Sequence, residues 1–124
     1  MSSFEQKRQF YRLKYPKRAR PYVRLGEEMF QVTEVSEGGM RMIVNNFNSM
    51  YKGLSIKGIL NLNDEDQVEI EGAVLRFDQG EVIVQLRKGP TFKIMVDQQR
   101  HIKTKYPVFF AKLRERITLA QSIQ

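Results

Sequence analysis

The stretch QVEIEGAVLRFDQGEVIVQLR, residues 67–87, decides the fold class. In both halves of it apolar residues stand at every second position, and Asp78-Gln79-Gly80 separates the halves. Such alternation is typical of a β-strand with one buried face, and a short glycine-containing turn between two strands predicts a hairpin. Gly72, inside the first strand, predicts a bulge or a barrel corner.

Four more alternating segments precede this hairpin, joined by polar or glycine-containing turns. They span residues 19–25, 28–35, 40–44 and 54–62. Six short strands with tight connections favour an antiparallel barrel over a fold built from parallel strands and crossover helices. We therefore predict an all-β domain whose six-stranded antiparallel β-barrel covers residues 19–88.

The period of the sequence changes after Gly89-Pro90. Apolar residues then recur at the three- to four-residue spacing of a helix, in one stripe before Pro107 and a second stripe after it. The stripes consist of Phe92, Met95, Ile102 and Tyr106, and of Phe109, Phe110, Leu113, Ile117 and Ala120. We predict one short and one amphipathic C-terminal α-helix within residues 91–122. The second stripe is expected to cover one opening of the barrel; the alternative is that it binds a partner helix.

All of the net positive charge lies near the N-terminus. Residues 1–24 contain eight basic side chains and one acidic side chain, Glu5, whereas the rest of the chain contains equal numbers of each. A localised positive field attracts phosphates, although a solvated basic tail has the same composition. Residues 1–18 show no regular period. We expect them to form a flexible basic arm that lies partly against the barrel. We expect residues 1–124 as a whole to form a single domain.

The composition lacks the residues of most catalytic sites. There is no cysteine and one histidine, His101, so the ligands of the usual zinc site are missing. Neither a Gly-x-Ser-x-Gly nucleophile motif nor a phosphate-binding loop motif occurs. We therefore expect a protein that is not an enzyme and that uses no cofactor or metal. Because no apolar run approaches the ~20 residues of a membrane span and no signal region is seen, we expect a cytoplasmic protein without membrane insertion.

Two arginines in the arm can bind an anionic ligand. Arg8 and Arg12 stand four residues apart, and each guanidinium is a planar fork that binds a phosphate, or the O6/N7 edge of guanine, with two hydrogen bonds. The same spacing occurs at Arg20 and Arg24, where two outward side chains on one strand explain it. The arginine pair alone is therefore a weak signal.

The turn Glu-Val-Ser-Glu-Gly-Gly at residues 34–39 adds complementary groups. Glu34 can accept hydrogen bonds from the N1–H and N2–H₂ groups of guanine, and Ser36 offers a small hydroxyl. Gly38 and Gly39 allow positive φ and let a ligand approach the backbone closely. An ordinary Gly-Gly hairpin is the alternative interpretation of the turn.

Taken together, Arg8-x-x-x-Arg12 and the later Glu34-x-Ser36-x-x-Gly39 resemble the PilZ domain family, bacterial receptors for cyclic diguanylate (c-di-GMP). The resemblance implies a six-stranded barrel with a basic N-terminal arm and a C-terminal helix. It also implies that Arg8 and Arg12 bind phosphate and guanine, and that Ser36 and Gly39 line the pocket. Glu34 stands where the family has Asp or Asn, and its extra methylene moves the carboxylate outward by roughly 1.5 Å, one carbon–carbon bond.

Two further cations are candidate contacts under the same resemblance. Lys7 precedes Arg8 and is suited to a second, stacked c-di-GMP. Arg76 lies late in a predicted strand, where a surface ion pair is the alternative role.

The resemblance implies a c-di-GMP receptor whose arm becomes ordered over the barrel when ligand binds, which changes the surface offered to a downstream protein partner. Three other classes stay open. A PilZ adaptor would bind a protein through the arm or Phe109 and Phe110, without c-di-GMP. A basic barrel would bind nucleic acid by stacking Tyr11, Tyr15 and Tyr22 on bases, and a hydrolase would turn its ligand over. We favour the receptor, with c-di-GMP and no nucleic acid as ligand.

Overall fold

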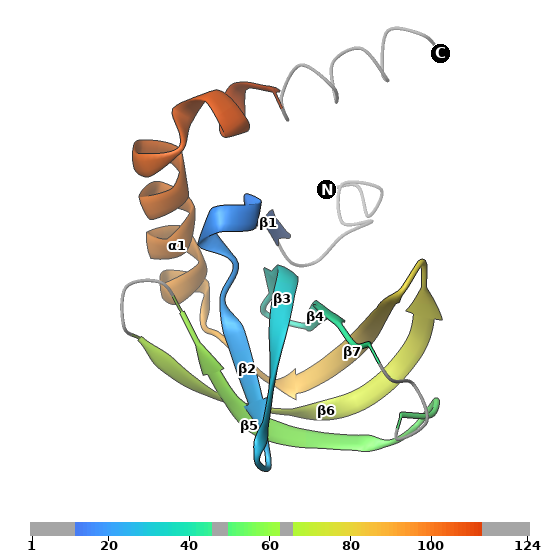
Figure 1. The fold of residues 1–124 in the computed structure, drawn as a ribbon. Helices are drawn as coiled ribbons and strands as arrows, with labels where there is room; N and C mark the ends of the chain where they lie inside the picture. Colours follow the sequence, from blue (N-terminus) through green and yellow to red (C-terminus); the bar gives the residue numbers. More distant parts are fainter. Residues whose placement is uncertain (1–11, 46–49, 63–65, 113–124) are drawn as a thin grey trace, which may run out of the picture.

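The computed structural model describes residues 12–45, 50–62 and 66–112. It contains a closed six-stranded antiparallel barrel, one extra strand and two C-terminal helical segments (Figure 1). The barrel strands are β2 (Tyr22–Leu25), β3 (Glu28–Ser36), β4 (Gly39–Ile43), β5 (Ser55–Asn61), β6 (Gln67–Asp78) and β7 (Glu81–Lys88). Their order is β3-β2-β5-β6-β7-β4, and pairing of β4 with β3 closes the barrel. The predicted fold class is confirmed.

The interior of the barrel follows the alternation of the sequence. On β7, Val82, Val84 and Leu86 are buried, whereas Ile83 and Gln85 point outward. Each fully buried aliphatic side chain of this kind stabilises the fold by roughly 1.5–3 kcal/mol. The residues between them are consequently free to form the outer surface, where any binding site of a filled barrel must lie.

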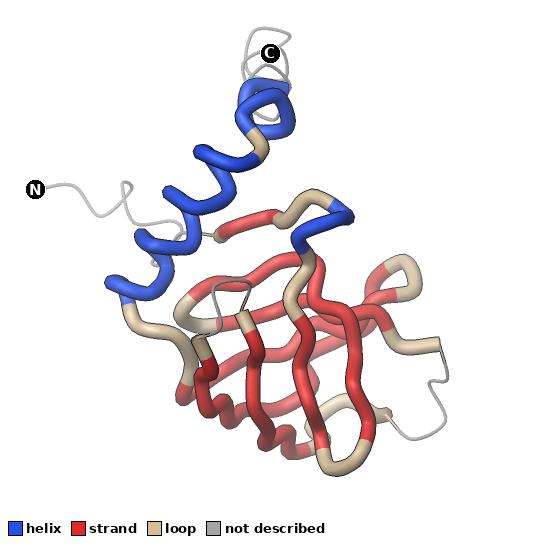
Figure 2. The backbone as a smooth tube through the Cα atoms, turned by 60° about the vertical axis from the view of Figure 1, so that its left-hand side comes forward, coloured by secondary structure: helices blue, strands red, loops and turns tan. Residues whose placement is uncertain are grey.

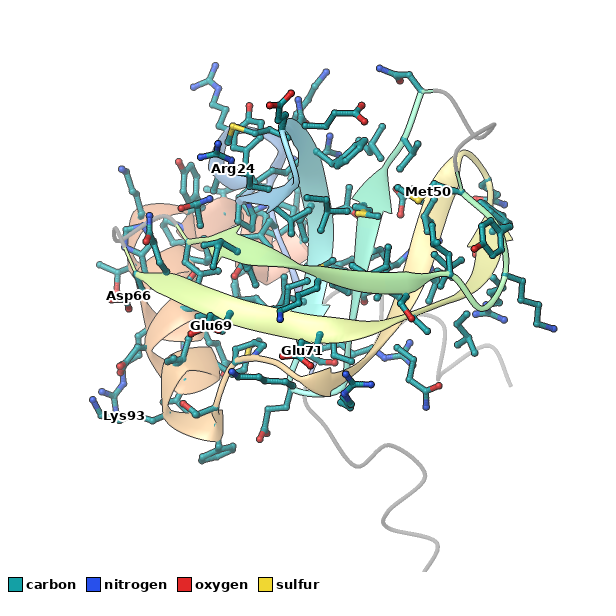
Figure 3. All side chains as sticks on the ribbon, turned by 90° about the horizontal axis from the view of Figure 1, so that it is seen from below. Arg24, Met50, Asp66, Glu69, Glu71 and Lys93 are labelled. Carbon is teal, nitrogen blue, oxygen red and sulfur yellow. The ribbon has the colours of Figure 1, made fainter. Side chains whose placement is uncertain are left out.

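Gly72 is the corner that the sequence predicts. The register between β6 and β7 shifts at Glu71/Gly72 and again between Val74 and Arg76. A Cβ added at Gly72 would lie 2.0 Å from the backbone oxygen of Gln85, so only glycine fits there. Glu69 and Glu71 lie on the outer face of this strand (Figure 3), where they form ion pairs with Lys88 and Arg87 of β7.

The first described residues are part of the folded body, which differs from the predicted extent of the arm. Strand β1 (Leu13–Lys14) pairs with β3, and the 3₁₀-helix η2 (Lys17–Ala19) follows it. Leu13 and Tyr15 are buried in the core, with 1% and 4% of their surfaces exposed. Their apolar side chains anchor this segment, so the folded body begins by residue 13, before the predicted start of the barrel at residue 19.

Helix α1 (Phe92–Lys105) lies beside β1 at one end of the barrel (Figures 1 and 2). Thr91 caps its N-terminus, because the side-chain oxygen accepts a hydrogen bond from the Ile94 amide at 3.2 Å. The buried face of α1 consists of Met95, Gln98 and Ile102.

One prediction about this helix is wrong. Phe92 was expected on the buried stripe but is 66% exposed, because the buried face of α1 runs through Met95, Gln98 and Ile102 and leaves Phe92 to one side. Gln98 is fully buried instead and accepts a hydrogen bond from the Tyr15 hydroxyl at 2.9 Å. This bond ties α1 to the segment that follows Arg12.

A second helical segment begins at residue 107 and is described as far as residue 112. Phe109 and Phe110 pack against the core, as expected for the start of the second stripe. Leu113, Ile117 and Ala120 lie outside the described residues. Among the helices that the structure describes, none is long and apolar enough to cross a membrane.

Candidate binding site

A cavity of about 500 Å³ lies on the outer surface of the barrel, across the neighbouring strands β3, β4, β7 and β6. Its volume falls in the range of roughly 300–1,000 Å³ that is common for small-molecule sites. The lining residues are Arg12, Glu34, Val35, Ser36, Gly38, Gly39, Met40, Arg41, Leu75, Arg76, Ile83, Val84 and Gln85. Six of the eight residues that the sequence suggested are in this set.

Arg12 reaches the cavity because β1 pairs with β3. Leu13 stands opposite Val35 and Lys14 opposite Glu34, which places the residue before β1 beside the end of β3. Two segments more than twenty residues apart in the sequence therefore meet at one cavity. Lys7 and Arg8, the other two suggested residues of the arm, lie outside the described residues.

The turn between β3 and β4 forms one wall. It is shorter than predicted: β3 extends to Ser36 and β4 begins at Gly39, so two residues connect the strands. The Ser36 hydroxyl donates a hydrogen bond to the Gly39 carbonyl at 3.3 Å, across the turn. The Leu86 amide donates to the Gly38 carbonyl at 2.9 Å, which holds the turn against β7.

The reason for glycine at this turn differs from the prediction. Gly38 and Gly39 would allow positive φ, but neither uses it: the described glycines with positive φ are Gly26, Gly53 and Gly80. At Gly39 a Cβ would lie 3.2 Å from the Val84 carbonyl oxygen. Gly39 is thus favoured by the close packing of β4 on β7, and its lack of a side chain leaves the floor of the cavity open.

Arg76 enters the cavity through the second irregularity in β6. The register shift between Val74 and Arg76 leaves Leu75 without a partner in the ladder, and both Leu75 and Arg76 line the cavity. Among the residues that the structure describes, Arg76 makes no ion pair. The alternative role of Arg76 as a surface ion-pair partner therefore finds no support.

The charged groups at the cavity favour an anion. Arg12, Arg41 and Arg76 line it together with one carboxylate, that of Glu34. Within residues 12–45, 50–62 and 66–112, neither Arg12 nor Glu34 forms an ion pair. No side chain in these ranges therefore competes with a ligand for them as an ion-pair partner.

A family model of the PilZ domain matches residues 6–104. The chain belongs to the PilZ family. Solved PilZ proteins share its fold: the inhibitor of motility MotI (DgrA) of Bacillus subtilis is 20% identical, with a TM-score of 0.59 over 81% of this chain and 52% of that chain. The PilZ domain of YcgR from Escherichia coli with c-di-GMP is 14% identical, with a TM-score of 0.54 over 94% of this chain and 98% of that one.

A longer structure of Escherichia coli YcgR, in complex with c-di-GMP, is 16% identical, with a TM-score of 0.50. It is matched over 96% of this chain and 51% of that chain, so this PilZ domain spans about half the length of MotI and of YcgR. No curated protein matches the sequence. At these identities the solved structures establish the fold of the chain.

Sequence reasoning missed one charged residue of this PilZ cavity, Arg41. Its Nε donates to Glu81 Oε1 at 2.8 Å and its Nη2 to Asp78 Oδ2 at 2.9 Å. Burial opposes the charge of Arg41, but the hydrogen bonds to Glu81 and Asp78 outweigh it and raise the pKa of the guanidinium. The available signal was the alternation of Met40 and Met42, both buried, which turns Arg41 outward.

The described part of this PilZ domain holds no group of three or more His, Cys, Asp or Glu side chains arranged for a metal ion. The cavity instead presents guanidiniums, a carboxylate, a hydroxyl and exposed backbone. Such groups recognise a ligand by hydrogen bonds and charge.

Proposed function

We propose that this PilZ domain is a receptor that binds c-di-GMP in the cavity across β3, β4, β7 and β6. The observation that carries the proposal is the meeting of Arg12 with the turn at residues 36–39 at one cavity. The membership of the chain in the PilZ family supports it, and so does the c-di-GMP in the solved complexes of YcgR.

The chemistry of the cavity fits a cyclic dinucleotide. A c-di-GMP molecule offers two anionic phosphates and two guanines, which need cationic donors and a carboxylate acceptor respectively. Arg12 and Arg76, which form no ion pair with any residue that the structure describes, supply donors, and Glu34 supplies the acceptor for guanine N1–H and N2–H₂. We propose that Lys7 and Arg8 add cations from the arm, that Ser36 and Gly39 line the pocket, and that Gly38 helps shape it.

The proposed mechanism is the ordering of the arm over the ligand. Each backbone residue that becomes fixed costs on the order of 1–2 kcal/mol, and each charge-assisted hydrogen bond returns about 1.5–3 kcal/mol. Several bonds must therefore form together, which favours a multidentate ligand over a simple anion. We propose that the closed arm presents a new surface to a downstream protein partner and that the chain acts in the cytoplasm without catalysis.

Calorimetry tests the binding proposal. We expect wild-type protein to bind c-di-GMP and to prefer it over GMP at least tenfold, and Arg8→Ala/Arg12→Ala to lose measurable binding. The matched control is Arg18→Ala/Arg24→Ala, which removes the same charge from two exposed residues that do not line the cavity. Its affinity should stay within about threefold of wild type, since exposed charges contribute little at a distance in salt.

Three results contradict the proposal in different ways. Wild-type protein that does not bind c-di-GMP would favour the protein adaptor. Equal losses of affinity in the two double variants would mean that binding depends only on net charge, as expected for a nucleic-acid-binding barrel. The affinity of such a barrel should also fall steeply with salt. Hydrolysed c-di-GMP in the calorimeter cell would indicate an enzyme.

A separate measurement tests the ordering of the arm. Amide hydrogen exchange of residues 5–12 should slow on addition of c-di-GMP. Unchanged exchange would remove the ordering mechanism and leave the binding proposal intact.

A further inference from the structure

A polar network fixes one arginine at the wall of the cavity. Arg41 donates through Nε to Glu81 and through Nη2 to Asp78, at 2.8 and 2.9 Å. The Thr33 hydroxyl donates to Glu81 Oε1 at 3.0 Å and so orients that carboxylate. The guanidinium is therefore held by the last residue of β6, Asp78, and the first residue of β7, Glu81.

This fixation leaves part of the guanidinium unused. Arginine has five N–H donors, and the contacts to Glu81 and Asp78 use two of them. Within the described chain, Nη1 of Arg41 has no hydrogen-bond partner, and about a quarter of the side chain is exposed, 26%. An arginine whose orientation is already set loses little side-chain entropy when it binds a ligand.

The position of Arg41 relative to Glu34 suggests what the free edge contacts. The two residues are direct partners across β3 and β4, so their side chains leave the same face of the sheet with Cβ atoms roughly 4.5–5.5 Å apart. Both line the cavity. A carboxylate beside a guanidinium matches the edge of guanine, where the N1–H and N2–H₂ donors adjoin the O6 acceptor.

We infer that Arg41 is a specificity-determining residue that donates to O6 of the guanine whose N1–H and N2–H₂ groups bind Glu34. This inference rests on the proposed function and assigns a role to a residue outside the arginine pair and the glycine turn. Glu81 and Asp78 are positioning residues, which act through Arg41. Adenine has an amino group in place of O6 and would meet the donors of Arg41 with a donor, so the pair rejects it.

Calorimetry with two cyclic dinucleotides tests the inference. Arg41→Ala should bind c-di-GMP at least tenfold more weakly than wild type, and Arg41→Lys should also be weakened because a single ammonium cannot reproduce the planar fork. Cyclic di-inosine monophosphate keeps O6 and N1–H but lacks the 2-amino group. Its affinity should fall in Arg41→Ala by the same factor as that of c-di-GMP, within about twofold.

The matched control is Arg87→Ala. Arg87 is also an outward arginine, paired to Glu71 at 2.7 Å between β7 and β6, but it does not line the cavity. We expect its c-di-GMP affinity to stay within about twofold of wild type. If Arg41→Ala does not fold, Arg41→Lys and Glu81→Gln carry the test, with a loss of threefold or more expected in each.

Nuclear magnetic resonance distinguishes direct contact of Arg41 with the ligand from an indirect, structural effect of this residue. In ¹⁵N-labelled protein the Nε–H resonance of Arg41 should shift during titration with c-di-GMP and saturate with the calorimetric stoichiometry, whereas that of Arg87 should not move. Wild-type binding together with an unchanged Arg41 resonance, or with full affinity in Arg41→Ala, would overturn this inference alone. Absence of wild-type binding would overturn the proposed function as well.

Discussion

The substitution Gly72→Ala tests the corner of the barrel and has a magnitude that follows from the structure. The added Cβ would lie 2.0 Å from the Gln85 carbonyl oxygen and 2.9 Å from the Leu86 Cα, whereas ordinary contacts begin at 3.4 Å. Strands β6 and β7 would have to separate locally by ~1.4 Å, the difference between 3.4 and 2.0 Å. A hydrogen bond of about 2.9 Å stretched by that amount no longer meets the geometric limits.

The expected cost combines two effects. Loss of about two backbone hydrogen bonds costs ~2 kcal/mol, and overpacking costs a further ~1–3 kcal/mol. We therefore expect Gly72→Ala to lower the free energy of unfolding by about 3–5 kcal/mol. Strand β7 lies between β6 and β4, and its Leu86 amide binds the Gly38 carbonyl on the β4 side, so a displacement of β7 should also disturb this wall of the cavity.

Urea denaturation followed by circular dichroism measures this effect. Gly26→Ala is the control, because Gly26 has a φ of 64° but no atom within 4 Å of an added Cβ. It should cost only about 1–2 kcal/mol, the penalty of the left-handed region for a residue with a side chain. A loss in Gly72→Ala that is no larger than the loss in Gly26→Ala would refute the argument from close approach.

Three further predictions concern the cavity and the outer face of β6. Glu34→Gln should weaken c-di-GMP binding about fivefold by calorimetry, because charge-assisted bonds to guanine become neutral ones; tighter binding would mean that Glu34 faces a phosphate. Ser36→Ala should lower the free energy of unfolding, measured in urea, by about 1 kcal/mol or less, because it removes one hydrogen bond, that of 3.3 Å to the Gly39 carbonyl. A larger loss would mean that this hydrogen bond is not the main contribution of Ser36 to the stability of the turn. The hydrogen bond from Arg87 lowers the pKa of Glu71. The ionised Glu71 therefore stabilises the fold fully above the ordinary pKa of 4.5, and this stabilisation is lost as pH falls through the lowered pKa. The stability difference between wild type and Glu71→Gln should accordingly shrink in acid, and a difference that grows would contradict this sign.

The positions of the six strands along the chain could be predicted from the sequence because the signals for each strand are local. Alternation of apolar and polar residues and the glycine-containing turns at Gly26 and Gly80 depend only on near neighbours, and they gave six strands whose ends agree with the structure within three residues. The helix after Pro90 was found from its period for the same reason. Phe92 was misassigned because periodicity alone does not show which of several residues near one face of a helix contact the core.

The start of the folded body could not be placed in this way. Leu13 and Tyr15 lie in a segment too short to show a period. Their burial depends on the pairing of β1 with β3 and, for Tyr15, on contact with Gln98 of α1. Likewise, the need for glycine at position 39 comes from its packing on Val84, a residue of another strand, and not from the turn itself.

The sequence by itself determined the barrel, the basic N-terminal segment and two polar motifs, since all of these are patterns among residues close in the chain. Only the tertiary structure decided that Arg12 and the turn at residues 36–39 share one cavity, and that Arg41 joins them between Asp78 and Glu81. Those contacts depend on strand pairing and register between segments up to some forty residues apart. A shift of one residue in that register would have turned Arg41 into the core and left the cavity without it.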